Sequence, residues 1–172
     1  MYRVGIVGHK PEDLLNFDKS VEILEDTIDL LRYQYGKDII FNVGGERGIE
    51  LSAGEYCRKN KFRYHLFLPQ RPNIFADTSW YEEQKDLLLK QFDVAFSITI
   101  CSPSSDKDIS IERDRDMLLI DDSNFVVSFW SGKKIGRTYD NIKYALEKNK
   151  IVLNGLDELK LLTNADLGKK RQ

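Results

Sequence analysis

Two glycine-containing segments each join an apolar run to an amphipathic stretch, and both have the composition of an anion-binding loop. They span residues 44–50 and 131–138. Glycine lets the backbone approach a phosphate without hindrance from a Cβ atom, and a helix N-terminus offers free amide hydrogens with about half a positive charge. The two segments together predict a site for a nucleotide or a related sugar phosphate, with amides from both segments directed at one ligand. The glycines are Gly44, Gly45, Gly48, Gly132 and Gly136.

Donor side chains elsewhere in the chain extend this predicted site. Gly8 permits a sharp turn after the first apolar run, and a guanidinium at Arg113 could clamp a phosphate in bidentate fashion. Simpler interpretations stay open for both residues. Gly8 is also typical of a plain turn after a strand, and the alternating charges at 113–116 are typical of a solvated helix face. The full set of predicted ligand-binding residues is Gly8, His9, Lys10, Gly44, Gly45, Gly48, Arg113, Gly132, Gly136, Arg137 and Thr138.

Glu50 is the candidate catalytic residue. It lies in the first turn of a predicted helix, where an acid can simply complement the helix dipole. It could equally point at a ribose hydroxyl or at a leaving group, and the sequence leaves both roles open.

Strand-like and helix-like segments alternate along the chain, which predicts parallel strands joined by crossover helices. The apolar runs lack strict alternation, as expected for a sheet covered on both faces. We therefore expect a single-domain α/β protein with a Rossmann-like, doubly wound, mostly parallel sheet flanked by helices on both faces. The domain is expected to span 1–155, followed by a partly flexible C-terminal extension at 156–172. The predicted strands are 2–7, 38–43, 63–68, 94–100, 124–130 and 151–153, and the predicted helices 17–35, 49–60, 80–92, 113–120 and 138–148.

Composition excludes several classes of protein. The 172 residues include 26 Lys plus Arg and 28 Asp plus Glu, a net charge of -2, so nucleic acid is not expected as a partner. Two Cys and two His cannot form a disulfide framework or a four-ligand zinc site, and no cofactor is expected. No apolar run approaches the roughly 20 residues of a membrane span, so we expect a cytoplasmic protein without a membrane partner. The G-x-G-x-x-G, P-loop and G-x-S-x-G motifs are absent.

Motifs in five places, in order over about residues 2–153, resemble the YpsA-like branch of the SLOG superfamily. This group of Rossmann-like proteins also includes the LOG hydrolases and the DNA-processing protein DprA. The loop after the second strand is similar to G-x-x-G-x-[DE], and the start of the last helix is similar to G-G-T-x-x-T-x-x-Y-A. The matching residues are Gly8, His9 and Pro11; Gly45, Gly48 and Glu50; Pro69, Gln70 and Trp80, with shifted spacing; Arg113 and Met117; and Gly136, Thr138, Tyr144 and Ala145.

The resemblance implies a bacterial SLOG-type protein that binds a nucleotide or nucleotide-derived ligand as a sensor, without turnover. LOG proteins hydrolyse the N-glycosidic bond of nucleoside monophosphates, but the position of their acid is occupied here by Asn141, and an amide cannot act as a general base. An alternative is a LOG-like hydrolase in which Glu50 acts instead. A weaker alternative is single-stranded DNA binding as in DprA, against which the acidic balance speaks. SLOG relatives often self-associate, so a homo-oligomer remains open.

Overall fold

A seven-stranded sheet organises the chain in the computed structural model, which describes residues 1–102 and 109–168. The strand order is β4-β3-β2-β1-β5-β6-β7, and every neighbouring pair is parallel except β6 with β7. The strands are β1 (Arg3–Gly8), β2 (Ile40–Val43), β3 (Tyr64–Leu68), β4 (Ser97–Ile100), β5 (Phe125–Phe129), β6 (Ile151–Asn154) and β7 (Lys160–Leu161).

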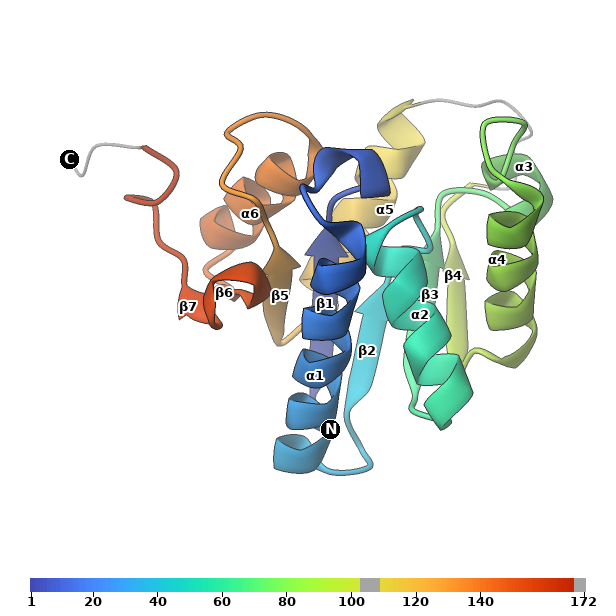
Figure 1. Ribbon diagram of the computed structural model, residues 1–172, viewed down its shortest axis with the longest axis horizontal. Helices are drawn as coiled ribbons and strands as arrows, with labels where there is room; N and C mark the ends of the chain where they lie inside the picture. The colour runs from blue at the N-terminus through green and yellow to red at the C-terminus, as the bar shows by residue number, and fades with distance from the viewer. Residues whose placement is uncertain (103–108, 169–172) are drawn as a thin grey trace.

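Helices cover both faces of this sheet. Figure 1 shows α1, α2 and α4 on the face toward the viewer and α5 and α6 behind the sheet. The α-helices are α1 (Phe17–Tyr35), α2 (Ile49–Asn60), α3 (Pro72–Phe75), α4 (Glu82–Val94), α5 (Ile109–Asp121) and α6 (Arg137–Glu147), with short 3-10 helices η1 (Pro11–Asp13) and η2 (Gly155–Asp157). The Rossmann-like, doubly wound α/β fold expected from the sequence is therefore confirmed.

Strand β1 explains why the apolar runs do not alternate with polar residues. Val4 and Ile6 pack into the core under α1 and α2, whereas Val7 packs into the core under α5 and α6. All three side chains are almost completely buried. A strand in the middle of a doubly covered sheet must be apolar on both sides, as the sequence pattern indicated.

Helix α1 shows how local sequence signals set an element. The Asn16 side chain accepts a hydrogen bond from the Lys19 amide at 3.1 Å and caps the start. Leu24, Ile28 and Leu31 recur every three or four residues and bury one face against the sheet. The helix ends at Tyr35, and these bounds match the predicted range 17–35.

The C-terminal stretch adds more structure than the sequence indicated. Lys160 and Leu161 form β7, which pairs with β6, and the side chains of Leu162 and Leu167 are buried under α5 and α6. A two-residue strand carries no recognisable periodicity, which explains why it was not predicted. Residues 103–108 and 169–172 lie outside the described residues.

The order of the strands reverses between β1 and β5. Strands β2, β3 and β4 follow one another on one side of β1, and β5 then pairs with β1 on the other side. Loops at the carboxyl ends of two such strands diverge to opposite faces of the sheet and leave a crevice between them. Among the described residues, no helix combines the length and apolar character that a membrane crossing requires.

Candidate ligand-binding site

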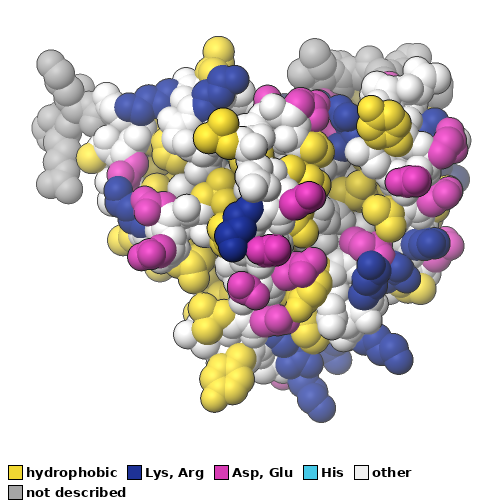
Figure 2. Space-filling view, viewed as in Figure 1, with side chains coloured by type: hydrophobic (Ala, Val, Ile, Leu, Met, Phe, Trp, Pro, Cys, Tyr) yellow, Lys and Arg dark blue, Asp and Glu magenta, His cyan; other side chains and the backbone are white. Residues whose placement is uncertain are grey.

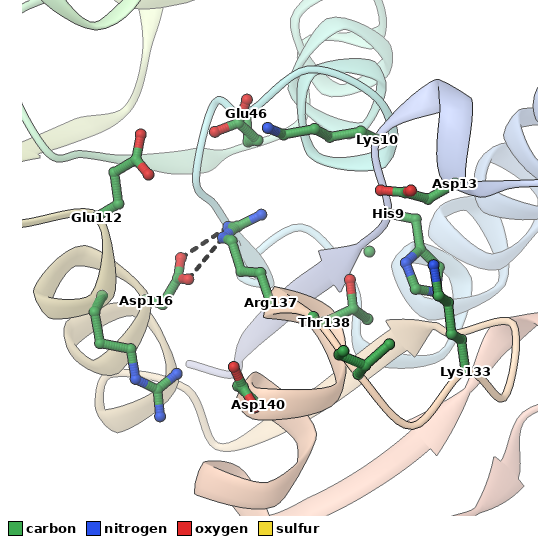
Figure 3. Close-up of a pocket in the computed structure, with 14 residues that line it drawn as sticks. His9, Lys10, Asp13, Glu46, Glu112, Asp116, Lys133, Arg137, Thr138 and Asp140 are labelled. Atoms are coloured by element: carbon green, nitrogen blue, oxygen red, sulfur yellow. Dashed lines mark hydrogen bonds and ion pairs between the residues drawn. The ribbon is translucent and has the colours of Figure 1, made fainter. Parts of the chain in front are cut away.

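A pocket of about 510 Å³ opens at the carboxyl ends of β1 and β5, where the strand order reverses. Figure 3 shows its walls, which come from the β1–α1 loop, the β2–α2 loop, α5, and the β5–α6 loop with the start of α6. The lining residues are Gly8, His9, Lys10, Asp13, Glu46, Glu112, Arg113, Asp116, Lys133, Ile135, Gly136, Arg137, Thr138 and Asp140.

Two hydrogen bonds from Trp130 fix the conformation of the β5–α6 loop. The Trp130 amide donates to Asn154 Oδ1 at 3.1 Å, and its indole nitrogen donates to the Lys133 carbonyl at 2.9 Å. Gly132 and Gly136 have φ values of 93° and 100°, a region that side chains disfavour, and a Cβ at either would meet open space. These two glycines are therefore required for the path of the loop.

The first turn of α6 presents unused donors to the pocket. The amides of Arg137, Thr138 and Tyr139 find no acceptor within residues 1–102 and 109–168, whereas the Asp140 amide already donates to the Gly136 carbonyl. Figure 3 shows the Thr138 hydroxyl directed into the pocket. Three amides without an acceptor among the described residues, together with a hydroxyl, give a helix N-terminus the donors that an anion requires.

The first glycine segment packs differently from the second, and its glycines do not line the pocket at which both segments are expected to direct amides. A Cβ at Gly48 would lie 2.3 Å from the His9 carbonyl oxygen, and one at Gly45 would lie 2.8 Å from Leu68. The amides at the start of α2 are partly consumed, since Ile49 donates to the His9 carbonyl and Leu51 to the Glu46 carbonyl. These glycines permit close packing of α2 against the β1–α1 loop and the core.

Only part of the predicted set therefore lines the pocket. Of the segment 44–50, Glu46 lines the pocket, and Glu46 was not among the predicted residues. The structure brings together Gly8, His9, Lys10, Arg113, Gly136, Arg137 and Thr138, and it leaves Gly44, Gly45, Gly48, Glu50 and Gly132 outside the lining.

Arg137 binds two buried carboxylates at once. Its guanidinium forms a bidentate pair with Glu50, at 2.7 and 2.9 Å, and a second bidentate pair with Asp116, at 2.7 and 2.8 Å. Arg115 joins the group through Asp116 at 2.7 Å and through the Gly44 carbonyl. Two guanidinium groups and two carboxylates balance in charge. Arg137 consequently has little attraction left for a ligand phosphate.

Burial and pairing shift the pKa values of these acids in opposite directions. Burial alone would raise the pKa of Asp116, but the neighbouring guanidinium groups of Arg137 and Arg115 lower it to about 2. Burial raises the pKa of Glu50, although Arg137 opposes this. Asp116 is therefore firmly ionised, while Glu50 lies 1% exposed beneath Arg137 and does not reach the pocket.

The sequence interpretation missed Arg115 and Asp116 as inward-facing residues. Four residues further along α5, Leu119 and Ile120 are completely buried, and positions i and i+4 share a helix face. That spacing could have shown that the first turns of α5 direct charge inward. Arg113 instead lines the pocket, donates to Asn141 Oδ1 at 2.9 Å and lies over the Tyr144 ring.

Metal binding has no support in the described part of the chain. Residues 1–102 and 109–168 contain no group of three or more His, Cys, Asp or Glu side chains with the geometry of a metal site.

Comparison with known proteins identifies solved structures that share this fold. No protein-family model matches the chain, and no curated protein sequence matches it. The solved structure of TM1055, a structural-genomics target, matches with a TM-score of 0.56 and 17% identity over 88% of this chain and 72% of that one. DprA from Streptococcus pneumoniae matches with a TM-score of 0.64 and 12% identity over 92% of this chain. The chain therefore shares its fold with these two structures.

A second DprA, from Helicobacter pylori, was solved to explain its single-stranded DNA binding mode. It matches this chain with a TM-score of 0.60 and 14% identity, over 92% of this chain and 71% of that one. The chain spans about half of the Streptococcus pneumoniae DprA, 54% of its length. Identities this low support the fold alone.

Proposed function

We propose that this SLOG-type chain binds a nucleotide or nucleotide-derived ligand as a YpsA-like sensor, without turning it over. The observation that carries the proposal is the start of α6, where three unpaired amides and the Thr138 hydroxyl face a pocket at the point of strand reversal. The phosphate binds there, and the rest of the ligand extends toward α5 and the β1–α1 loop.

The charges around the pocket favour a ligand with few phosphates. Its lining carries four Lys or Arg and five Asp or Glu side chains, and Arg137 is already neutralised by Glu50 and Asp116. A polyanion would meet repulsion from these acids. One phosphate joined to a group rich in hydroxyl or amino donors, such as a nucleoside monophosphate, fits the mixture better.

A thermal-shift panel of nucleoside monophosphates tests the proposal. A ligand present at about 100 times its dissociation constant stabilises a protein by about 2.7 kcal/mol. Thr138→Val is expected to weaken binding by about tenfold, because one hydrogen bond to a charged group is lost. Thr78→Val, at an exposed position away from the pocket, is the matched control. Equal shifts in both variants would overturn the proposed phosphate position.

Hydrolysis of the N-glycosidic bond is a second candidate, favoured by the raised pKa of Glu50. It requires the bidentate pair between Glu50 and Arg137 to open, because neither carboxylate oxygen is free otherwise. Release of free base from a nucleoside monophosphate, abolished in Glu50→Gln, would replace the sensor proposal with this one.

Single-stranded DNA binding is the third candidate, since a DprA of the same fold is known for it. A continuous basic groove is the usual requirement. Figure 2 shows acidic side chains gathered over α1 on the face toward the viewer. These residues include Asp18, Glu22, Glu25, Asp26 and Asp29. Filter binding of an oligonucleotide at two salt concentrations decides between this candidate and a small ligand, because phosphate contacts weaken steeply with salt.

A further inference from the structure

His9 connects the two loops that meet at the strand reversal. The Ser131 amide donates a hydrogen bond to His9 Nε2 at 3.1 Å, across 122 residues of sequence. The Ser131 hydroxyl lies 3.2 Å from the same nitrogen. Ser131 follows Trp130 near the start of the loop that leads to the first amides of α6, so the imidazole contacts that loop close to its beginning.

The histidine is itself fixed by the start of α2. Its carbonyl accepts the Ile49 amide at 3.2 Å, and Gly48 approaches so closely that no side chain would fit between them. His9 is 6% exposed as a whole residue. The backbone of His9 is therefore held against α2 while its ring contacts the β5–α6 loop, so the residue connects the two.

The bond from Ser131 has one chemical requirement. A nitrogen that accepts a hydrogen bond must carry its lone pair, so the ring proton of neutral His9 resides on Nδ1. In the imidazolium form both ring nitrogens donate, and Nε2 then faces an amide hydrogen that it can no longer accept. Protonation therefore removes the hydrogen bond from the Ser131 amide and sets these two donors against each other, which leaves the Ser131 hydroxyl as the one group of that residue that can still pair with Nε2.

We propose that His9 is a positioning residue that holds the anion-binding loop in place only while its ring is neutral, so that anion binding weakens at acid pH. This proposal rests on the proposed function, because it assigns a pH dependence to anion binding at the same site. It also differs from the sequence expectation, in which His9 contacts the ligand directly. A direct contact would gain a positive charge on acidification and would bind an anion more tightly.

The groups around His9 agree with a neutral ring at physiological pH. Burial lowers its pKa below the ordinary 6.5, Asp13 on η1 raises it, and Lys133 on the β5–α6 loop lowers it. Figure 3 shows both charged side chains beside the ring. From α2, the groups in contact are Gly48 and Ile49, which carry no charge. The connection is therefore present at neutral pH and is lost as the pH falls below the lowered pKa.

Binding of inorganic sulfate, measured by calorimetry, tests the direction of the effect, since sulfate keeps its charge through the range in which histidine titrates. Affinity is expected to fall about fivefold, the loss expected from one hydrogen bond, between about pH 7.5 and a pH below the lowered pKa of His9. His9→Gln, whose side-chain oxygen can accept the same amide but does not titrate, is expected to bind equally at both values. Ser131→Ala keeps the amide and is expected to keep the pH dependence. Affinity that rises on acidification would overturn the proposal and support a direct contact.

The Ser131 amide provides a readout that needs no ligand. Its proton chemical shift, followed by NMR, is expected to titrate together with the His9 ring, and to be independent of pH in His9→Gln. An amide shift that does not follow the ring overturns the proposal. Absence of sulfate binding at every pH would remove the proposed phosphate site, while the amide titration would still decide the role of His9.

Discussion

Arg137 shows how one side chain can change what a binding loop offers. In the motif that the chain resembles, its position belongs to a glycine, and here a guanidinium fills the space below the pocket. Its charge is consumed by Glu50 and Asp116, both of which are buried. The side chain of Arg137 therefore lies between Glu50 and the pocket, while the backbone amide of Arg137 has no acceptor among the described residues.

Removing this guanidinium is expected to destabilise the fold. Arg137→Met leaves Glu50 and Asp116 buried without their main partner, which costs about 3–5 kcal/mol in comparable buried pairs. Urea unfolding measures the change in the free energy of unfolding. Lys134→Met, at an exposed position in the same loop, is expected to change it by less than about 0.5 kcal/mol. Equal stabilities would show that the network contributes nothing to the fold.

Acid is expected to unfold the protein partly through Asp116. Its pKa is lowered from 3.8 to about 2, so it stabilises the fold above its unfolded pKa and loses this as the pH falls through the folded value. The lost stability is about 2 kcal/mol between about pH 5 and about pH 2. Asp116→Asn should reduce that drop in urea unfolding, whereas Asp114→Asn, on the exposed face of α5, should keep it. An unchanged drop in Asp116→Asn contradicts the lowered pKa.

At the scale of elements, two segments of similar composition have different tasks. The sequence predicts both as strand, glycine loop and helix, and the helix bounds of 49–60 are confirmed. Which atoms pack against a glycine depends on residues far along the chain, such as His9 against Gly48. Local sequence does not predict these contacts. The pocket could therefore be located from the sequence at the correct edge, but its walls could not be assigned.

Gly48 is expected to tolerate substitution worse than Gly36. Both have positive φ values, 97° and 80°, so a change of either to alanine is expected to lower the free energy of unfolding by about 1 kcal/mol. At Gly48 the new Cβ also meets the His9 carbonyl, whereas at Gly36 it meets open space. Gly48→Ala should therefore lower the free energy of unfolding by at least about 2 kcal/mol more than Gly36→Ala. Similar losses in chemical denaturation would contradict the close packing of α2 on the β1–α1 loop.

For the whole molecule, alternation of strands and helices was sufficient to predict the sheet and its ligand edge. In the structure the order reverses where β5 pairs with β1, and the pocket forms there, as expected for the carboxyl edge of such a sheet. The C-terminal stretch was harder to predict, because no regular spacing shows that Leu162 and Leu167, among the several leucines of this stretch, are the buried ones. Their burial depends on the completed second core.

That burial makes the C-terminal stretch part of the stability of the fold. Leu162→Ala is expected to lower the free energy of unfolding by about 2–4 kcal/mol, because the side chain is 4% exposed and its removal leaves a cavity. Its neighbour Leu161 is 54% exposed, and Leu161→Ala should cost less than about 0.5 kcal/mol. Thermal unfolding of both variants provides the comparison, and equal melting temperatures would show that the stretch does not pack on the core.

The central claim is that the start of α6 binds the anionic group of a nucleotide. Titration of the protein with adenosine monophosphate, followed by amide chemical shifts in NMR, tests it most directly. We predict that the largest shifts occur at the three amides that lack acceptors, those of Arg137, Thr138 and Tyr139. Saturable shifts confined to the start of α2, or no saturable shifts at all, would contradict it.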